Sequence, residues 1–110
     1  MSQPQPKKYN KLVRDRIPEI IKLKGGRPVF RTADETEYWL KLKEKLREEV
    51  EEFMGAKDTS AAKEELADVL EVVNAIAAHL KCHRNEIEII RIKKAEERGA
   101  FTGRVILDEA

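Results

Sequence analysis

The chain has 110 residues, which suits one domain with one modest core and is too short for two. Its 22 basic residues nearly balance its 21 acidic residues, so the overall charge favours neither a nucleic acid polymer nor an anionic membrane as a partner. Residues 1–8 are rich in Gln, Pro and Lys and predict a disordered tail. We expect residues 9–110 to form a single domain.

The segment that follows the tail predicts a short helix and then an extended stretch. Pro18 suits the first turn of a helix, and the glycines at positions 25–26 mark its end. Residues 27–33 alternate in part between apolar and polar side chains, so we expect an extended lead into the next element. Within them, residues 29–30 are a weak strand candidate.

A long helix is predicted next. Asp34 and Glu37 have the spacing of a capping box, and good helix formers continue to about Met54, where Gly55 is a natural stop. This helix contains the acidic sequence EEVEE.

Two further helices complete the expected order of elements. One covers about residues 61–81, and its candidate N-caps are Asp58, Thr59 and Ser60. The other covers residues 86–98, with Asn85 as its cap and Gly99 at its end. Residues 105–107 are the second weak strand candidate. The pattern predicts an all-α protein, an antiparallel helical bundle with at most short peripheral extended segments.

The acidic residues of the first long helix can be sorted by their positions around its axis, because each residue advances about 100°. Glu49 lies about 60° and Glu52 about 120° from the centre of the apolar stripe, whereas Glu48 and Glu51 fall on the far side. We therefore expect the first pair to flank the core and the second to face water. The stripe consists of Trp39, Leu42, Leu46, Val50 and Phe53.

The second long helix repeats this arrangement. Glu65 and Asp68 lie on the corresponding shoulder of its stripe, and the apolar Val72 and Ala75 follow along that shoulder. These acids thus occupy a face that the rest of the helix is expected to bury. The stripe consists of Leu66, Val69, Leu70, Val73 and Leu80.

If the short turn folds these helices into an antiparallel pair, four carboxylates converge beside the core. Their repulsion and desolvation oppose folding unless something offsets them. A set of oxygen ligands suits Mg²⁺ or Mn²⁺. The alternative is a solvated, charged surface with lysine partners, which the i,i+4 spacing of Lys45 and Glu49 permits.

Several segments resemble one protein superfamily. EEVEE followed by ELAD is similar to the EExxE and ExxD motifs of the all-α nucleotide pyrophosphohydrolases, which include MazG, dimeric dUTPases and phosphoribosyl-ATP pyrophosphohydrolase. The opening YNKLVRDRIPEII and the closing KKAEERGAFTGRVIL resemble the MazG-like, house-cleaning branch. The resemblance covers nearly all of the chain from Tyr9 to Leu107. Ala100 departs from it, since related segments often have a second glycine at this position.

The resemblance implies a metal-dependent hydrolase. It makes Glu49, Glu52, Glu65 and Asp68 the ligands of Mg²⁺, with Mn²⁺ as a possible substitute. It also implies hydrolysis of a nucleoside triphosphate, including non-standard or damaged ones, between the α and β phosphates, and assembly as a homodimer or homotetramer. Phosphoribosyl-ATP is a less favoured substrate, because the chain has no strong signature of histidine biosynthesis.

Other residues are candidates for catalysis and substrate binding. Glu48 and Glu71 are both possible general bases, and the sequence does not choose between them. Phe101 could stack on a base or belong to the core. For the basic candidates, the alternative is a solvated surface charge. The candidates for phosphate binding are Lys11, Arg14, Lys94, Arg98 and Arg104.

Two alternatives remain from the sequence. His79 and His83 have the i,i+4 spacing of a helical zinc pair, with Cys82 nearby, although no fourth ligand accompanies them. The chain could also be a non-catalytic helical interaction module whose acids bind a structural cation or a basic partner. No apolar run approaches the roughly 20 residues that cross a bilayer. Since Cys82 is the only cysteine and no signal peptide is evident, we expect a cytoplasmic protein.

Overall fold

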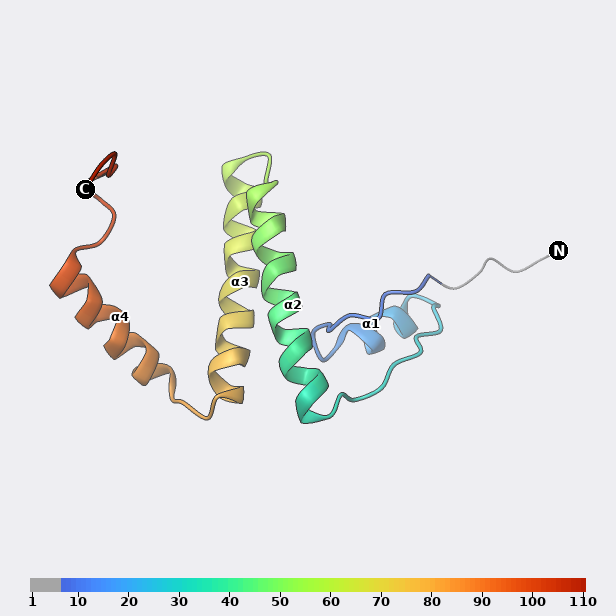
Figure 1. Ribbon diagram of the computed structural model, residues 1–110. Coiled ribbons are helices and arrows are strands. Elements are labelled where there is room, and N and C mark those ends of the chain that lie inside the picture. Colours follow the sequence, from blue (N-terminus) through green and yellow to red (C-terminus); the bar gives the residue numbers. More distant parts are fainter. Residues whose placement is uncertain (1–6) are drawn as a thin grey trace. The chain divides into compact units, whose positions relative to one another are not determined.

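A computed structural model describes residues 7–110, and within them it contains four α-helices and no strand (Figure 1). The all-α prediction is confirmed for these residues, and the two weak strand candidates, 29–30 and 105–107, have no regular secondary structure. Most of the predicted tail, residues 1–6, lies outside the described residues. None of the described helices has the length and apolar character needed to cross a membrane.

The chain divides into two units, Met1–Val73 and Asn74–Ala110, and the division falls within one long helix. Each unit is therefore described by itself. The first contains α1 (Ile17–Leu23), α2 (Glu35–Met54) and most of α3 (Thr59–His79). The second contains the end of α3 and α4 (Arg84–Arg98).

Helix α1 is short, and its ends follow the predicted signals. Pro18 lies in the first turn, where its missing N–H would have no partner within the helix. Beyond the helix, Gly25 adopts φ 89°, a left-handed conformation that glycine reaches without strain. The N–H of Gly26 then donates to the carbonyl of Ile21 at 2.9 Å, which closes the last turn.

Helix α2 begins at the predicted cap. The side chain of Asp34 accepts a hydrogen bond from the N–H of Glu37 at 2.8 Å. The capping box is only half formed, however, because the carboxylate of Glu37 pairs with Arg31, with Nη2 and Oε2 2.6 Å apart. The helix ends before Gly55, as predicted, and the N–H of Gly55 donates to the carbonyl of Glu51.

Helix α3 follows after the four-residue connection 55–58 and starts two residues before the predicted position 61. Among the three candidate caps, the structure selects Asp58, whose Oδ1 accepts from the N–H of Ala61 at 2.8 Å. The helix ends at His79, two residues before the predicted position 81. Lys81 there adopts φ 57°, and the N–H of Cys82 donates to the carbonyl of Ala77.

Helix α4 begins at Arg84, so the prediction that Asn85 caps this helix is wrong. The cap position is held by His83, whose backbone is extended and whose side chain makes no capping hydrogen bond. The helix ends at Arg98, where the following Gly99 has φ 82°. A glycine is favoured at this position because a Cβ would be strained there.

Helices α2 and α3 lie side by side as an antiparallel pair (Figure 1). The packing face of α2 coincides only in part with the predicted stripe. Leu42 is the most buried side chain, at 1% exposed, and Glu49 is almost as enclosed. Val50, which was predicted to lie in the apolar stripe, is 42% exposed. The packing face is thus rotated by about 50° from the predicted stripe, toward Glu49.

The same correction applies to α3. Its packing face is the shoulder that contains Val72, which is buried, together with the half-buried Glu65 and Asp68. Leu66 and Leu70 of the predicted stripe are instead 46% and 61% exposed. The expectation that the helix would bury the shoulder bearing the acids is confirmed. Much of the predicted apolar stripe faces away from α2.

Candidate functional site

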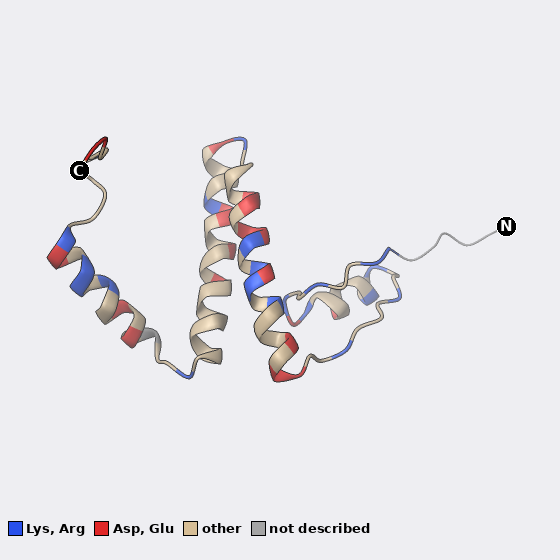
Figure 2. Ribbon diagram, viewed as in Figure 1, with Lys and Arg blue, Asp and Glu red and all other residues tan. Residues whose placement is uncertain are grey.

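The acidic motifs occupy neighbouring ends of α2 and α3. EEVEE lies in the last two turns of α2, and ELAD lies in the second and third turns of α3. Because the connection 55–58 is only four residues long, the two motifs face each other across the helix pair. Figure 2 shows Asp and Glu residues on both helices toward this connection.

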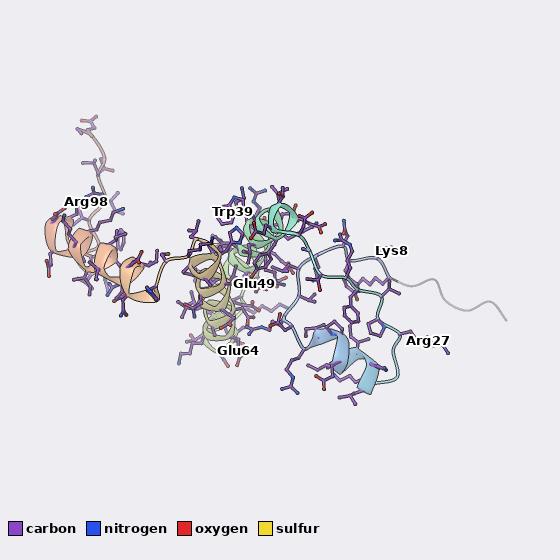
Figure 3. All side chains as sticks on the ribbon, turned by 90° about the horizontal axis from the view of Figure 1, so that it is seen from below. Lys8, Arg27, Trp39, Glu49, Glu64 and Arg98 are labelled. Carbon is purple, nitrogen blue, oxygen red and sulfur yellow. The ribbon has the colours of Figure 1, made fainter. Side chains whose placement is uncertain are left out.

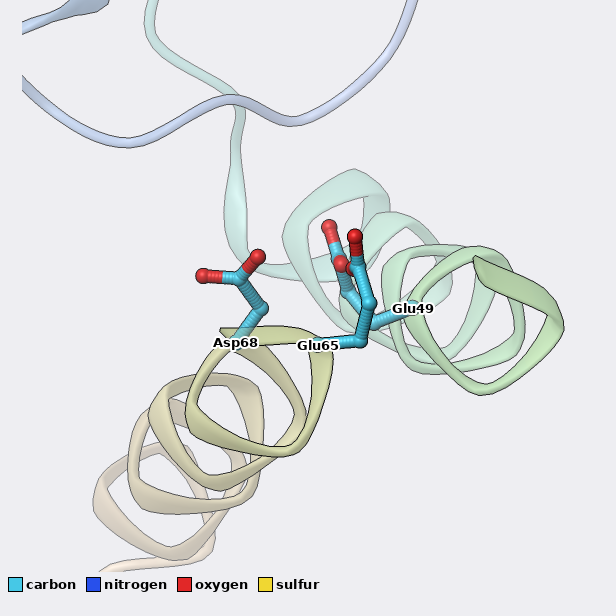
Figure 4. A group of neighbouring side chains, drawn as sticks. All are labelled: Glu49, Glu65 and Asp68. Carbon is cyan, nitrogen blue, oxygen red and sulfur yellow. The ribbon is translucent and has the colours of Figure 1, made fainter. Parts of the chain in front are cut away.

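Three carboxylates meet between the two helices. Glu49 of α2 and Glu65 and Asp68 of α3 each offer an oxygen, and these oxygens all lie within 4.8 Å of one another (Figure 4). Glu65 and Asp68 share a face because residues three apart are neighbours on a helix. We call these three residues the acidic cluster. Within the described part of the chain, no other group of three or more His, Cys, Asp or Glu side chains is close enough to share a metal ion.

Glu49 holds the most enclosed position of the cluster. It is 9% exposed and lies where α2 meets α3, whereas Glu64 on α3 is exposed to solvent (Figure 3). Glu52, the fourth predicted ligand, is exposed and lies outside the cluster. Three of the four predicted ligands are thus brought together.

The crowding of negative charge perturbs Glu65. Desolvation raises the pKa of its carboxyl group, and the charges of Asp68, Glu49 and Glu52 raise it further, as does a hydrogen bond with Glu49. Glu52 therefore acts on the cluster through its charge, although its oxygens lie outside the group. A nearby cation would stabilise the ionised form of this carboxyl group, because it would offset the repulsion from the neighbouring acids.

Two basic side chains already lie against the cluster. The Nζ of Lys45 is 3.2 Å from Oε1 of Glu49 and 3.3 Å from Oε2 of Glu48. The Nη2 of Arg14 is 2.7 Å from Oδ1 of Asp68. The ion pair predicted from the i,i+4 spacing of Lys45 and Glu49 is confirmed. The structure therefore contains both the lysine partner expected for a charged helix surface and the cluster of carboxylates expected for a metal site.

The prediction that Glu48 faces water is wrong. Glu48 is half-buried, and its Oε1 lies 3.1 Å from Nζ of Lys11. Partial burial raises the pKa of Glu48, but the hydrogen bond from Lys11 and the charge of Lys45 outweigh this effect and lower the pKa overall. The physical reason is that the segment before α1 approaches this side of α2. Glu51, by contrast, is exposed as predicted.

Sequence reasoning named Lys11 and Arg14 only as phosphate ligands and missed their ion pairs. Their partners Glu48 and Asp68 are 37 and 54 residues away along the chain. No local periodicity links residues at such separations. The one available signal was the excess of acid on both helices, which predicts nearby cations without saying which ones.

The remaining predicted residues are not part of the cluster. Glu71 is exposed on α3. The other substrate-binding candidates belong to the second unit, and all of them are exposed: Lys94, Arg98, Phe101 and Arg104. Phe101 is 96% exposed, which gives no support to a core position in that unit.

The zinc alternative gains no support. The Sγ of Cys82 donates a hydrogen bond to the carbonyl of Ala77 at 3.4 Å, which is a structural role within the turn after α3. His79 and His83 do not form a possible metal site with it.

The acidic cluster fits a small divalent cation. Its donors are all carboxylate oxygens, the ligand type that Mg²⁺ and Mn²⁺ prefer over nitrogen and sulfur. Three donors on one side would leave positions in the coordination shell for water. The raised pKa of Glu65 also indicates that added positive charge would relieve repulsion here.

Comparisons with known proteins give one relative and no family. A protein of Mycolicibacterium smegmatis that is described only as uncharacterized is 53% identical over 53 residues, which are 48% of this chain and 54% of that protein. The chain thus spans about half the length of the curated relative it matches. No family model matches the chain, and no solved structure matches it.

Proposed function

We propose that the protein is a Mg²⁺-dependent nucleoside triphosphate pyrophosphohydrolase built on a MazG-like helical bundle. It would hydrolyse its substrate between the α and β phosphates and release a monophosphate and pyrophosphate. The observation that carries this proposal is the convergence of Glu49, Glu65 and Asp68 from two helices, with oxygens within 4.8 Å of one another. Their crowding opposes folding, and Lys45 and Arg14 offset part of this cost by pairing with Glu49 and Asp68, which leaves Glu65 for a cation to neutralise.

The residues of the cluster would hold the ion, and Glu52 would join them or bind through water. Mn²⁺ would substitute for Mg²⁺ because it accepts the same oxygen ligands. When bound, the ion supplies positive charge for the phosphate oxygens and lowers the pKa of a water. Lys45 would keep Glu49 in place through their 3.2 Å ion pair.

Of the two proposed bases, Glu48 has the better position. It shares Lys45 with Glu49, whereas Glu71 is exposed. Its carboxylate is ionised near neutral pH, the form that accepts a proton from water, although the lysines that lower its pKa also make it a weaker base. We therefore assign the general base to Glu48 and keep Glu71 as the second candidate.

Substrate phosphates would be bound by cations. Lys11 contacts Glu48 beside the cluster at 3.1 Å, and Arg14 contacts Asp68 within it at 2.7 Å. Lys94, Arg98, Arg104 and Phe101 belong to the second unit and remain substrate-binding candidates through the resemblance alone. We also propose a homodimer or homotetramer, because the predicted apolar stripe of α3 is largely exposed in the single chain.

Pyrophosphate release from a panel of nucleoside triphosphates with Mg²⁺ tests the proposal. The panel includes standard and damaged bases as well as phosphoribosyl-ATP. We expect release from at least one triphosphate and its loss in Glu49→Gln, with Glu51→Gln as the matched control in the same helix. If no compound is hydrolysed and Mg²⁺ leaves thermal unfolding unchanged, the non-catalytic interaction module becomes the better explanation.

A further inference from the structure

The segment before α1 makes three polar contacts with α2 and α3. We call residues 9–16 the opening segment. The carbonyl of Asn10 accepts a hydrogen bond from Nζ of Lys41 at 2.8 Å. Lys11 pairs with Glu48 and Arg14 pairs with Asp68. The first contact joins the segment to α2 without using an acid, and the other two depend on negative charge.

Arg14 and a divalent cation would compete for the same carboxylate. Its guanidinium is 2.7 Å from Oδ1 of Asp68, and Asp68 is also one of the three members of the acidic cluster. Two positive charges close together repel each other in addition to sharing an acceptor. The Arg14 and Asp68 side chains are 56% and 38% exposed, and such ion pairs are weak. A dication is therefore the stronger partner for Asp68.

The opening segment is anchored to α2 at Asn10, and the residues after this anchor can move. Asn10 adopts φ 44°, a left-handed conformation that asparagine tolerates better than most residues. Its contact with Lys41 holds the chain to α2 just before the two basic residues. Residues 12–14 form no regular secondary structure, and the carbonyl of Arg14 accepts a hydrogen bond from the N–H of Ile17 at 3.0 Å, so the Arg14 side chain can swing away while the start of α1 keeps this bond.

We propose that the opening segment is a cationic latch. Arg14 neutralises Asp68 while no dication is present, and it leaves when a dication binds, with the contacts of Asn10 with Lys41 and of Lys11 with Glu48 as the retained anchors. Release turns Arg14 toward solvent, where it is available to the phosphates of an incoming substrate. This inference rests on the proposed metal site and adds a means by which metal binding prepares the substrate site.

Calorimetric titration with MgCl₂ or MnCl₂ alone tests the competition. Arg14→Gln should bind the ion about two- to fivefold more tightly than the wild type, the range that an exposed ion pair supports. The matched control is Arg16→Gln, two residues further along the chain. It removes the same charge, but the Arg16 side chain pairs with Glu19 and not with the acidic cluster. We expect its affinity to equal that of the wild type. Equal or weaker binding by Arg14→Gln overturns the latch.

Limited trypsin digestion of the wild type supplies a readout that needs no variant. Trypsin must take the side chain of Arg14 into its pocket, so the ion pair with Asp68 protects the bond after Arg14. We expect Mg²⁺ to speed cleavage after Arg14 relative to cleavage after Lys11 and Lys24, measured by mass spectrometry. Unchanged or slower cleavage contradicts the latch if calorimetry shows that the wild type binds the ion. If the wild type binds neither Mg²⁺ nor Mn²⁺, the metal site fails as well.

Discussion

Glu49 carries a charge in a position that is only 9% exposed, and this makes it the most informative residue to change. Glu49→Gln keeps the size of the side chain while it removes one charge from the acidic cluster. Lys45 retains Glu48 as a partner, so we expect the stability of the metal-free protein to stay within about 1 kcal/mol of the wild type or to rise. Turnover should be nearly abolished, because a metal ligand is lost. Denaturant unfolding and pyrophosphate release measure the two effects.

Two neighbouring variants serve as controls for Glu49→Gln. Glu51 is exposed, so Glu51→Gln should leave both turnover and stability nearly unchanged. Glu48→Gln should lower kcat if Glu48 is the general base, while metal binding is largely retained. A loss of activity in Glu51→Gln as large as that in Glu49→Gln, with the fold intact, would show that the inner face of α2 has been assigned incorrectly.

The raised pKa of Glu65 gives a pH dependence with a definite sign. Desolvation and the neighbouring acids disfavour its ionised form in the native state. The resulting loss of stability is absent below the unfolded-state pKa, about 4.3, and grows as the pH rises through the higher native-state pKa. In metal-free protein, the melting temperature of Glu65→Gln should therefore exceed that of the wild type by more at pH 7 than near pH 4. A difference that is constant across this range would argue against repulsion at Glu65.

At the level of elements, the helices could be predicted because their signals are local. Asp34 was identified as a cap, and Gly55 and Gly99 as stops, from a few neighbouring residues, and the structure uses all three. The packing faces could not be predicted as well, because apolar residues alone were used to orient the helices. In the structure, Lys45 and Glu49 pair with each other on the buried side of α2, while Val50 is left exposed.

The part of the candidate site that depends on local spacing along one helix could be predicted from the sequence. The i,i+3 spacing of Glu65 and Asp68 placed both on one face of α3, and that face is the one that meets α2. The ion pairs of Arg14 and Lys11 required knowledge of the path of the opening segment. That path depends on tertiary contacts such as Lys41 with Asn10, which no helical period encodes.

The cap of α3 stabilises the start of the helix that carries Glu65, because Asp58 lies two turns before Glu65. Its Oδ1 accepts from the N–H of Ala61 at 2.8 Å. Asp58→Ala should lower the free energy of unfolding by about 0.5–2 kcal/mol, the usual effect of losing a cap. Asp58→Asn should be nearly neutral, because asparagine caps a helix about as well. Urea unfolding separates these cases, and equal losses in both variants would indicate that the charge of Asp58 matters more than its hydrogen bond.

For the whole molecule, the exposed side of α3 predicts self-association. Leu66, Leu70 and Val73 are 46%, 61% and 36% exposed in the single chain. We expect light scattering at micromolar concentration to give at least twice the monomer mass of 12.7 kDa. Leu70→Glu should shift the mass toward the monomer, because burying a carboxylate in an apolar contact is costly. Leu23→Glu, which changes a leucine in α1 that is 80% exposed, is the control. A monomeric wild type would contradict the prediction.

The four-residue connection between α2 and α3 has a consequence for how the protein folds. The acidic cluster spans only residues 49–68, a range that contains the end of α2, the connection 55–58 and the first turns of α3. Contacts between such near neighbours close small loops, whose entropic cost is low, and chains dominated by them fold quickly. The helical hairpin can therefore form early, before the opening segment reaches it from as far as 54 residues away. A folding φ-value is the change in the folding barrier divided by the change in stability that a mutation causes, and we expect a value near 1 for truncation of Val72 in the hairpin.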